Sequence, residues 1–281
     1  MSLSVLRTLS IGLALSALLA PALAYGQQQQ QQKLPGFDAL PDWSGIWQMQ
    51  GGTVFDAATM TPKGVGTGTP NAREFPPYTP EFEKIYLENI KRVAEGRFPD
   101  PVNTCGVPHG WPRAINLPDV YEFVVRPEQT WILGENGPNI IRIYTDGRPH
   151  PDAEELWPTY SGDSVGHWEG DTLVFDTVSP KGWLIDNDVI VDRTGLVLSE
   201  KLHTVTRMRK IDPNTIELVM TLDDEKALTK PWTITKRYRK MPAGTRAYDY
   251  GCAENNRNPV APSGRTLTLG PDGKPIDKDT K

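Results

Sequence analysis

The sequence predicts a mainly β domain, an antiparallel meander closed or nearly closed into a barrel, with one accessory helix. Three observations support this prediction. About nine short segments rich in β-branched and aromatic residues follow one another, separated by turn residues. Most connections are too short for the crossover that a parallel pair requires. Closing so many strands into a barrel removes exposed edges, and a barrel of this size can hold one small ligand.

The predicted strands are bounded by turn signals. Glu-Gly-Asp at 169–171 indicates a tight hairpin, and Asp-Pro-Asn at 212–214 indicates a turn. The expected strands are residues 42–49, 121–126, 129–134, 139–145, 164–168, 172–178, 201–210, 215–222 and 232–239.

One helix is predicted over residues 80–97, because apolar residues recur there at helical spacing. Thr79 can cap its start, and Pro80 occupies the first helical position. Gly96 can end it. The apolar positions are Phe82, Ile85, Tyr86, Ile90 and Val93.

Residues 1–24 have the three parts of a cleaved secretory signal peptide. Arg7 supplies the positive charge, residues 13–19 form a short apolar run, and Ala-Leu-Ala at 22–24 suits a signal peptidase. A membrane anchor is less favoured, because the run is too short to cross a bilayer and is broken at Pro21. We therefore expect a periplasmic or secreted protein with no membrane span after cleavage.

The rest of the chain divides by composition. Residues 25–39 form a Gln-rich spacer that we expect to be disordered, because it cannot bury apolar surface. A single β-barrel domain is expected over residues 40–255, and residues 256–281 form a polar tail.

Charge and cysteine content limit the partners. The formal net charge of −5 and the lack of interleaved basic and aromatic residues argue against a nucleic-acid partner. In an oxidising compartment, a disulfide between Cys105 and Cys252 is the default prediction. The alternative is a nucleophilic or metal-bound thiol.

Gly45-Ile46-Trp47 on the first predicted strand, with Arg237 and Arg239 on the last, resembles the lipocalin/calycin pattern. In that group a Gly-x-Trp on the first strand packs against a basic side chain from the final strand. The resemblance implies a closed barrel.

A wider resemblance covers most of the chain. DWSGIW at 42–47, IYTDGRPH at 143–150, GHWEGDTLV at 166–174, PW at 231–232 and CAENN at 252–256 resemble a family of secreted bacterial proteins. Most members have no assigned activity. Some relatives are similar to cofactor-free decarboxylases of lignin-derived aromatic acids. The chain departs from this family at Leu198-Ser199, where His-Ser is usual, and at Thr206-Arg207, where Glu-Arg is usual.

His167 and Glu169 are the first candidate pair for acid–base chemistry. Residues two apart on a strand point to the same face, and an imidazole beside a carboxylate can exchange protons. In the alternative, Glu169 and Asp171 hydrogen-bond the hairpin backbone. No His-x-His or His-x-x-x-His pair is present, so no metal ligands are predicted.

Arg142 and Tyr144 form a second pair on one strand face. Arginine binds carboxylates through its planar fork, and tyrosine can hold or deprotonate a phenol. In the alternative, Arg142 points to solvent while Ile141 and Ile143 fill the core. The predicted substrate-binding residues are His203, Arg207, Tyr121 and Trp168.

The resemblance and these residues together predict an exported lyase that decarboxylates a small aromatic acid of the lignin-derived type. His167 or Glu169 would serve as acid or base, Tyr144 as phenol partner and Arg142 as carboxylate ligand. No cofactor is predicted, because the sequence lacks a phosphate loop and a dinucleotide fingerprint. The alternatives are a lipocalin-like carrier of a small apolar ligand and a metal-dependent hydrolase. Self-association into a homo-oligomer is left open.

Overall fold

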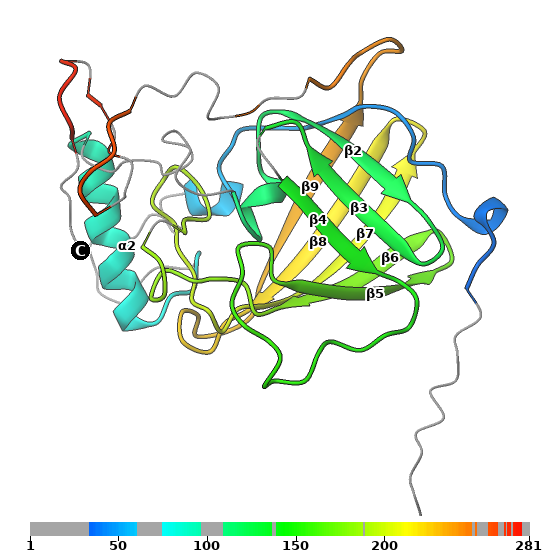
Figure 1. Ribbon diagram of the computed structural model, residues 1–281, viewed down its shortest axis with the longest axis horizontal. Helices are drawn as coiled ribbons and strands as arrows, with labels where there is room; N and C mark the ends of the chain where they lie inside the picture. Colours follow the sequence, from blue (N-terminus) through cyan, green and yellow to red (C-terminus); the bar gives the residue numbers. More distant parts are fainter. Residues whose placement is uncertain are drawn as a thin grey trace, which may run out of the picture. The chain divides into compact units, whose positions relative to one another are not determined.

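A computed structural model describes residues 34–60, 75–96, 109–136, 139–187 and 189–248, with short stretches between 251 and 276. Nine strands form one closed barrel in chain order (Figure 1), which confirms the predicted fold class. The strands are β1 Trp47–Met49, β2 Val120–Val125, β3 Gln129–Gly134, β4 Asn139–Tyr144, β5 Asp163–Glu169, β6 Thr172–Val178, β7 His203–Asp212, β8 Thr215–Asp223 and β9 Trp232–Lys240. The described helices are α2 Pro80–Ala94 and the short 3-10 turns Phe37–Ala39, Ala57–Met60 and Arg113–Ile115.

Several predicted features lie outside the described residues. They are the signal peptide, most of the Gln-rich spacer, and both Cys105 and Cys252. The signal peptide and the disulfide therefore stay predictions. Among the described residues, no helix is long and apolar enough to cross a membrane.

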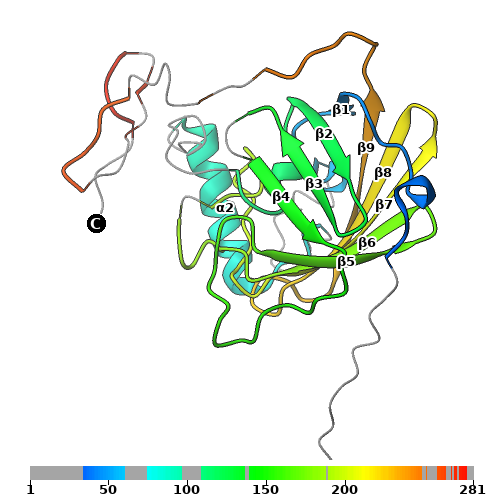
Figure 2. The same cartoon turned by 45° about the vertical axis from the view of Figure 1, so that its right-hand side comes forward.

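The strand pairing departs from the predicted meander at one point. Consecutive strands pair antiparallel except β4 and β5, which pair parallel at Ile143 with Ser164 and at Tyr144 with Val165. The connection over residues 145–162 is long enough to return the chain to the same end of the sheet. Strand β1 closes the barrel between β2 and β9 (Figure 2).

Alternate residues of each strand point inward and fill the barrel. On β9, Trp232, Ile234, Lys236 and Tyr238 are buried while the residues between them are exposed. Aromatic rings from different strands meet inside: the ring centroid of Tyr238 lies 5.2 Å from that of Tyr121. Loops add further buried rings, including Trp111 and Phe55. In the described residues the barrel interior is thus a packed hydrophobic core.

The Gly-x-Trp motif packs as the lipocalin/calycin resemblance implies, but with a different basic partner. Trp47 is fully buried, and the Nζ atom of Lys240 lies 5.5 Å from the centre of its ring. The predicted partner Arg237 instead hydrogen-bonds Glu217 on the outer face, and Arg239 is also exposed. Neither Arg237 nor Arg239 therefore packs against Trp47 as the resemblance implies, because both side chains point outward on β9.

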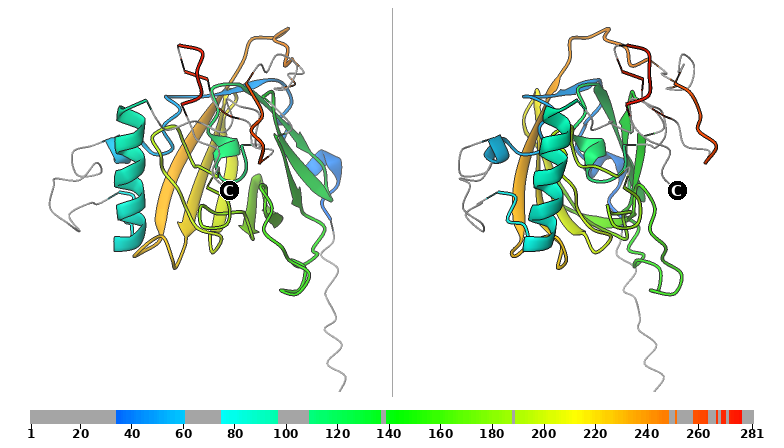
Figure 3. Two further views of the ribbon diagram at one scale, coloured as in Figure 1. Left: turned by 60° about the vertical axis from the view of Figure 1, so that its left-hand side comes forward. Right: turned by 90° about the vertical axis from the view of Figure 1, so that its left-hand side faces the viewer.

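Helix α2 lies outside the barrel wall (Figure 3) and ends before Gly96, close to its predicted end. Thr79 occupies the predicted N-cap position, but its side chain makes no capping hydrogen bond. Its hydroxyl instead donates to the carbonyl of Lys226 and so ties the helix start to the loop after β8. Asn89 donates to the carbonyl of Gly195 from the buried face of the helix. The helix therefore packs on the connection between β6 and β7.

Lys236 is a buried cation within the barrel. Its side chain is 7% exposed, and its Nζ atom donates to the carbonyl of Val54 at 2.9 Å and to Oδ1 of Asn116 at 2.6 Å. Burial lowers the pKa of Lys236 from 10.5 to about 8, although Asp192 and Asp56 oppose the shift.

This shift predicts a pH-dependent contribution to stability. Between the folded and unfolded pKa values the unfolded chain binds more protons, so the contribution of Lys236 to the free energy of unfolding rises with pH. Relative to a Lys236→Met variant, the wild type should gain about 2 kcal/mol between pH 7 and pH 9.5 in denaturant unfolding. Equal pH slopes for the two proteins would show that the amine is not desolvated.

Candidate active site

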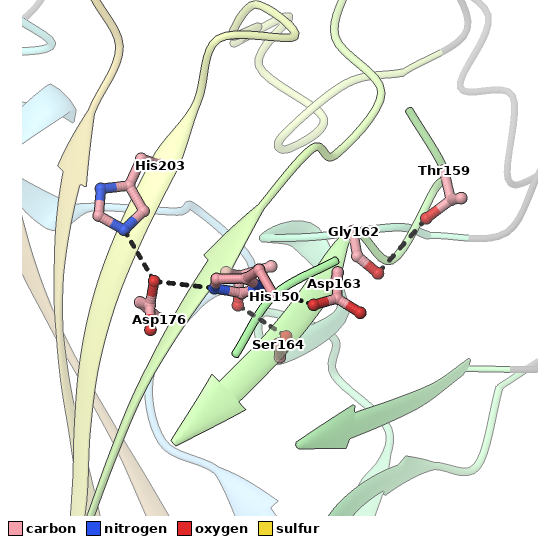
Figure 4. A network of polar contacts seen from close by, with 8 residues as sticks. His150, Thr159, Gly162, Asp163, Ser164, Asp176 and His203 are labelled. Carbon is pink, nitrogen blue, oxygen red and sulfur yellow. Dashed lines mark hydrogen bonds and ion pairs between the residues drawn. The ribbon is translucent and has the colours of Figure 1, made fainter. Parts of the chain in front are cut away.

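Four side chains form a chain of polar contacts on the outer face of β5, β6 and β7. We call His150, Asp163, Asp176 and His203 the outer-face cluster (Figure 4). Nε2 of His203 lies 3.2 Å from Oδ2 of Asp176, which lies 3.0 Å from Nε2 of His150. Nδ1 of His150 lies 2.5 Å from Oδ1 of Asp163.

Strand register brings three of the four residues to this face. Val165 pairs with Asp176, which pairs with Val205 on β7. Asp163 and His203 each lie two residues before one of these valines and therefore share the outer face with Asp176. The connection between β4 and β5 adds His150.

Gly162 lets the connection reach this position. Its φ is +67°, and a Cβ atom there would lie 2.7 Å from the carbonyl oxygen of Val178. Both features favour glycine immediately before Asp163.

His150 lies between two carboxylates that can share a proton with it. Each ring nitrogen faces a carboxylate oxygen, and each such contact needs one hydrogen, but a neutral imidazole carries only one. When one proton beyond those of a neutral imidazole and two carboxylates is present, His150, Asp163 and Asp176 can share it and both contacts are hydrogen bonds. The side chain of His203 is 44% exposed and that of His150 20% exposed, so a ligand at the surface can approach both.

A second cluster on the same face contains the predicted acid–base pair. Nε2 of His167 lies 3.2 Å from Oε1 of Glu169, and Nη2 of Arg207 donates to Oε2 of Glu169 at 2.6 Å. The hydrogen bond from Arg207, followed by that from His167, lowers the pKa of Glu169. Glu169 is therefore a persistent anion that orients His167, and it bonds side chains rather than the hairpin backbone. All three side chains are about half exposed.

The remaining predicted site residues are divided by the barrel wall. Arg142 and Tyr144 lie on the outer face of β4. Tyr121 is buried inside, where its hydroxyl accepts a hydrogen bond from the amide of Leu117, and Trp168 points inward against Trp43. A single small ligand therefore cannot contact both sets, so the residues predicted to act on one substrate do not line one site in the described part of the chain.

Three members of the outer-face cluster were not predicted as site residues. Asp176 carried a signal: it is a carboxylate in an otherwise apolar strand segment. His150 sits in a loop, so strand periodicity could not place it. Among the described residues, no three His, Cys, Asp or Glu side chains are arranged to hold a metal ion.

The fold and the site define a closed β-barrel protein with a histidine–carboxylate cluster on its outer face. No protein-family profile, curated protein or solved structure matches the chain. The barrel is compatible with a lipocalin/calycin-like fold, whereas the resemblance to decarboxylases rests on the motif residues alone.

Proposed function

We propose that the protein is a cofactor-independent lyase that decarboxylates a small para-hydroxylated aromatic acid at the outer-face cluster. The observation that supports this is the continuous chain of contacts from His203 through Asp176 and His150 to Asp163. Such a chain supports the proposal because a base and a proton donor within one small site are what this reaction requires. The substrate class comes from the motif resemblance.

His203 is the base of the proposed mechanism. Asp176 accepts the hydrogen bond of Nε2, which holds the ring in the tautomer whose Nδ1 carries the lone pair. Nδ1 makes no hydrogen bond to a described residue, and it takes the phenolic proton of the substrate.

The proton shared around His150 completes the reaction. It passes to the side-chain carbon next to the carboxylate, giving a quinone methide. The bond to the carboxylate carbon then breaks, its electron pair forms the new side-chain double bond, and carbon dioxide leaves. The phenolate recovers its proton from His203, and water restores the proton at His150, so the net change consumes one proton.

A carrier that holds an apolar ligand within the barrel is the competing proposal. It needs an interior hollow, but buried rings such as Tyr121, Phe123 and Tyr238 lie in contact across the interior. The outer-face cluster also has no purpose in a carrier of this kind. We therefore favour the lyase.

The proposal is tested by incubating the purified protein with a panel of phenylpropenoic acids and lignin-type dimers. We expect release of carbon dioxide and a product lighter by that mass for at least one para-hydroxylated acid. Saturable binding without any product would support the carrier. Cleavage that is abolished by a chelator and restored by a metal would support the hydrolase.

A comparison of the two clusters locates the chemistry. We expect His167→Gln to leave turnover within about threefold of wild type, because it removes only an exposed pair of small energetic value. Turnover is measured beside that of His203→Gln. Loss of activity in His167→Gln alone would move the reaction to the second cluster.

A further inference from the structure

Arg148 is held in a fixed position beside the outer-face cluster. Its Nε atom donates to Oδ1 of Asp146 at 2.9 Å and its Nη2 atom to Oδ2 at 2.6 Å. Its Cζ atom lies 4.1 Å from the centre of the Tyr144 ring. The planar guanidinium is thus fixed on one edge by a carboxylate and on one face by an aromatic ring.

Arg148 lies two residues before His150 and is therefore close to the cluster along the chain. The hydrogen bond to Asp146 is the main cause that raises the pKa of Arg148, and the charge of Asp163 adds to it. Asp163 is bonded to His150, and His150 follows Arg148 by two residues. The guanidinium of Arg148 and the ring of His150 therefore lie close together on the protein surface.

Part of the guanidinium remains available. Asp146 occupies Nε and Nη2, whereas Nη1 makes no hydrogen bond to any described residue. The side chain of Arg148 is 51% exposed. An incoming carboxylate can therefore accept a hydrogen bond from Nη1 without displacing Asp146.

We propose that Arg148, rather than Arg142, binds the carboxylate of the substrate and holds it beside His150. The inference rests on the proposed function for the identity of the substrate, but it concerns binding alone. Arg142 also lies on the outer face, yet it makes no hydrogen bond or ion pair with the described residues. It would lose more conformational freedom on binding a carboxylate than the prearranged Arg148 does.

Binding of a saturated analogue tests the inference without turnover. The probe is 3-(para-hydroxyphenyl)propanoate, which lacks the double bond that the reaction protonates, and its primary amide is the uncharged comparison. By calorimetry we expect the wild type to prefer the acid over the amide. Arg148→Gln should weaken acid binding about tenfold to a hundredfold and leave amide binding unchanged, because one charge-assisted contact is lost.

Two further arginines supply the controls. Arg142→Gln should bind the acid like wild type. Arg126→Gln is a matched control, since Arg126 is paired with Glu128 two residues away, lies over the Phe37 ring and is 48% exposed. Circular dichroism of each variant establishes that the barrel is folded.

The outcomes separate this inference from the lyase proposal. A selective loss of acid binding in Arg148→Gln supports the subsite, even when no acid in the panel is decarboxylated. Loss in Arg142→Gln with retention in Arg148→Gln overturns it. Equal binding of acid and amide by the wild type overturns it as well, whatever the turnover measurements show.

Discussion

Replacement of His203 by Gln is expected to lower turnover of the aromatic acid by roughly a hundredfold to ten-thousandfold. Glutamine can still donate a hydrogen bond to Asp176, but it cannot accept the phenolic proton. The measurement is the rate of carbon dioxide release at saturating substrate. Binding of the saturated analogue should change little, because the base acts on the proton rather than on the carboxylate.

The Asp176→Asn variant is a second test of whether the outer-face cluster carries out the reaction. Both histidines contact the same oxygen of Asp176, and the uncharged amide oxygen is a weaker hydrogen-bond acceptor than the carboxylate, so it holds the tautomer of His203 and the position of His150 less firmly. We expect a loss of turnover similar to that of His203→Gln, and a double variant that is little worse than either single one. Near-wild-type rates in both single variants would remove the outer-face cluster from the mechanism.

Replacement of Phe175 by Ala is expected to lower the free energy of unfolding by about 3–5 kcal/mol. Phe175 precedes Asp176 on β6 but points inward, where it is 1% exposed and its ring centroid lies 5.7 Å from that of Trp111. The alanine would leave a cavity in a packed core. Denaturant unfolding measures the loss, and turnover per folded molecule should stay near the wild-type value.

The Asp176→Asn variant at the adjacent position is expected to do the opposite: it should lower turnover and leave stability nearly unchanged. Asp176→Asn alters a side chain that is 35% exposed, so the free energy of unfolding should fall by no more than about 1 kcal/mol. Of these two adjacent residues on β6, the inward one would thus affect stability and the outward one would affect activity. A small effect of Phe175→Ala on stability would indicate that the barrel holds an open space near this ring.

Much of the fold was predictable because strand signals are local. The hairpin at residues 169–171 and the strand over residues 232–239 appear in the structure where the sequence predicts them. The first strand is shorter than predicted: only Trp47–Met49 pairs, and the φ of Gly45 is +101°, outside the range of a strand. The parallel pairing of β4 and β5 was missed because it depends on where a long connection returns, which local pattern does not determine.

The candidate site was predictable only within single strands. The contact between His167 and Glu169 follows from their spacing of two residues, and the structure confirms it. The contacts of His150 with Asp163 and Asp176 join a loop to two strands, so they depend on register and on the path of the connection. Which face of a strand points inward also depends on how the barrel closes. The sequence therefore could not show that Tyr121 lies inside the barrel while other predicted site residues lie on its outer face.

The most direct test is a crystal structure of the protein with 3-(para-hydroxyphenyl)propanoate bound. We expect the ligand on the outer face of β5 to β7, with its phenol beside Nδ1 of His203 and its carboxylate beside Arg148. Density for the ligand among the buried rings inside the barrel would contradict it.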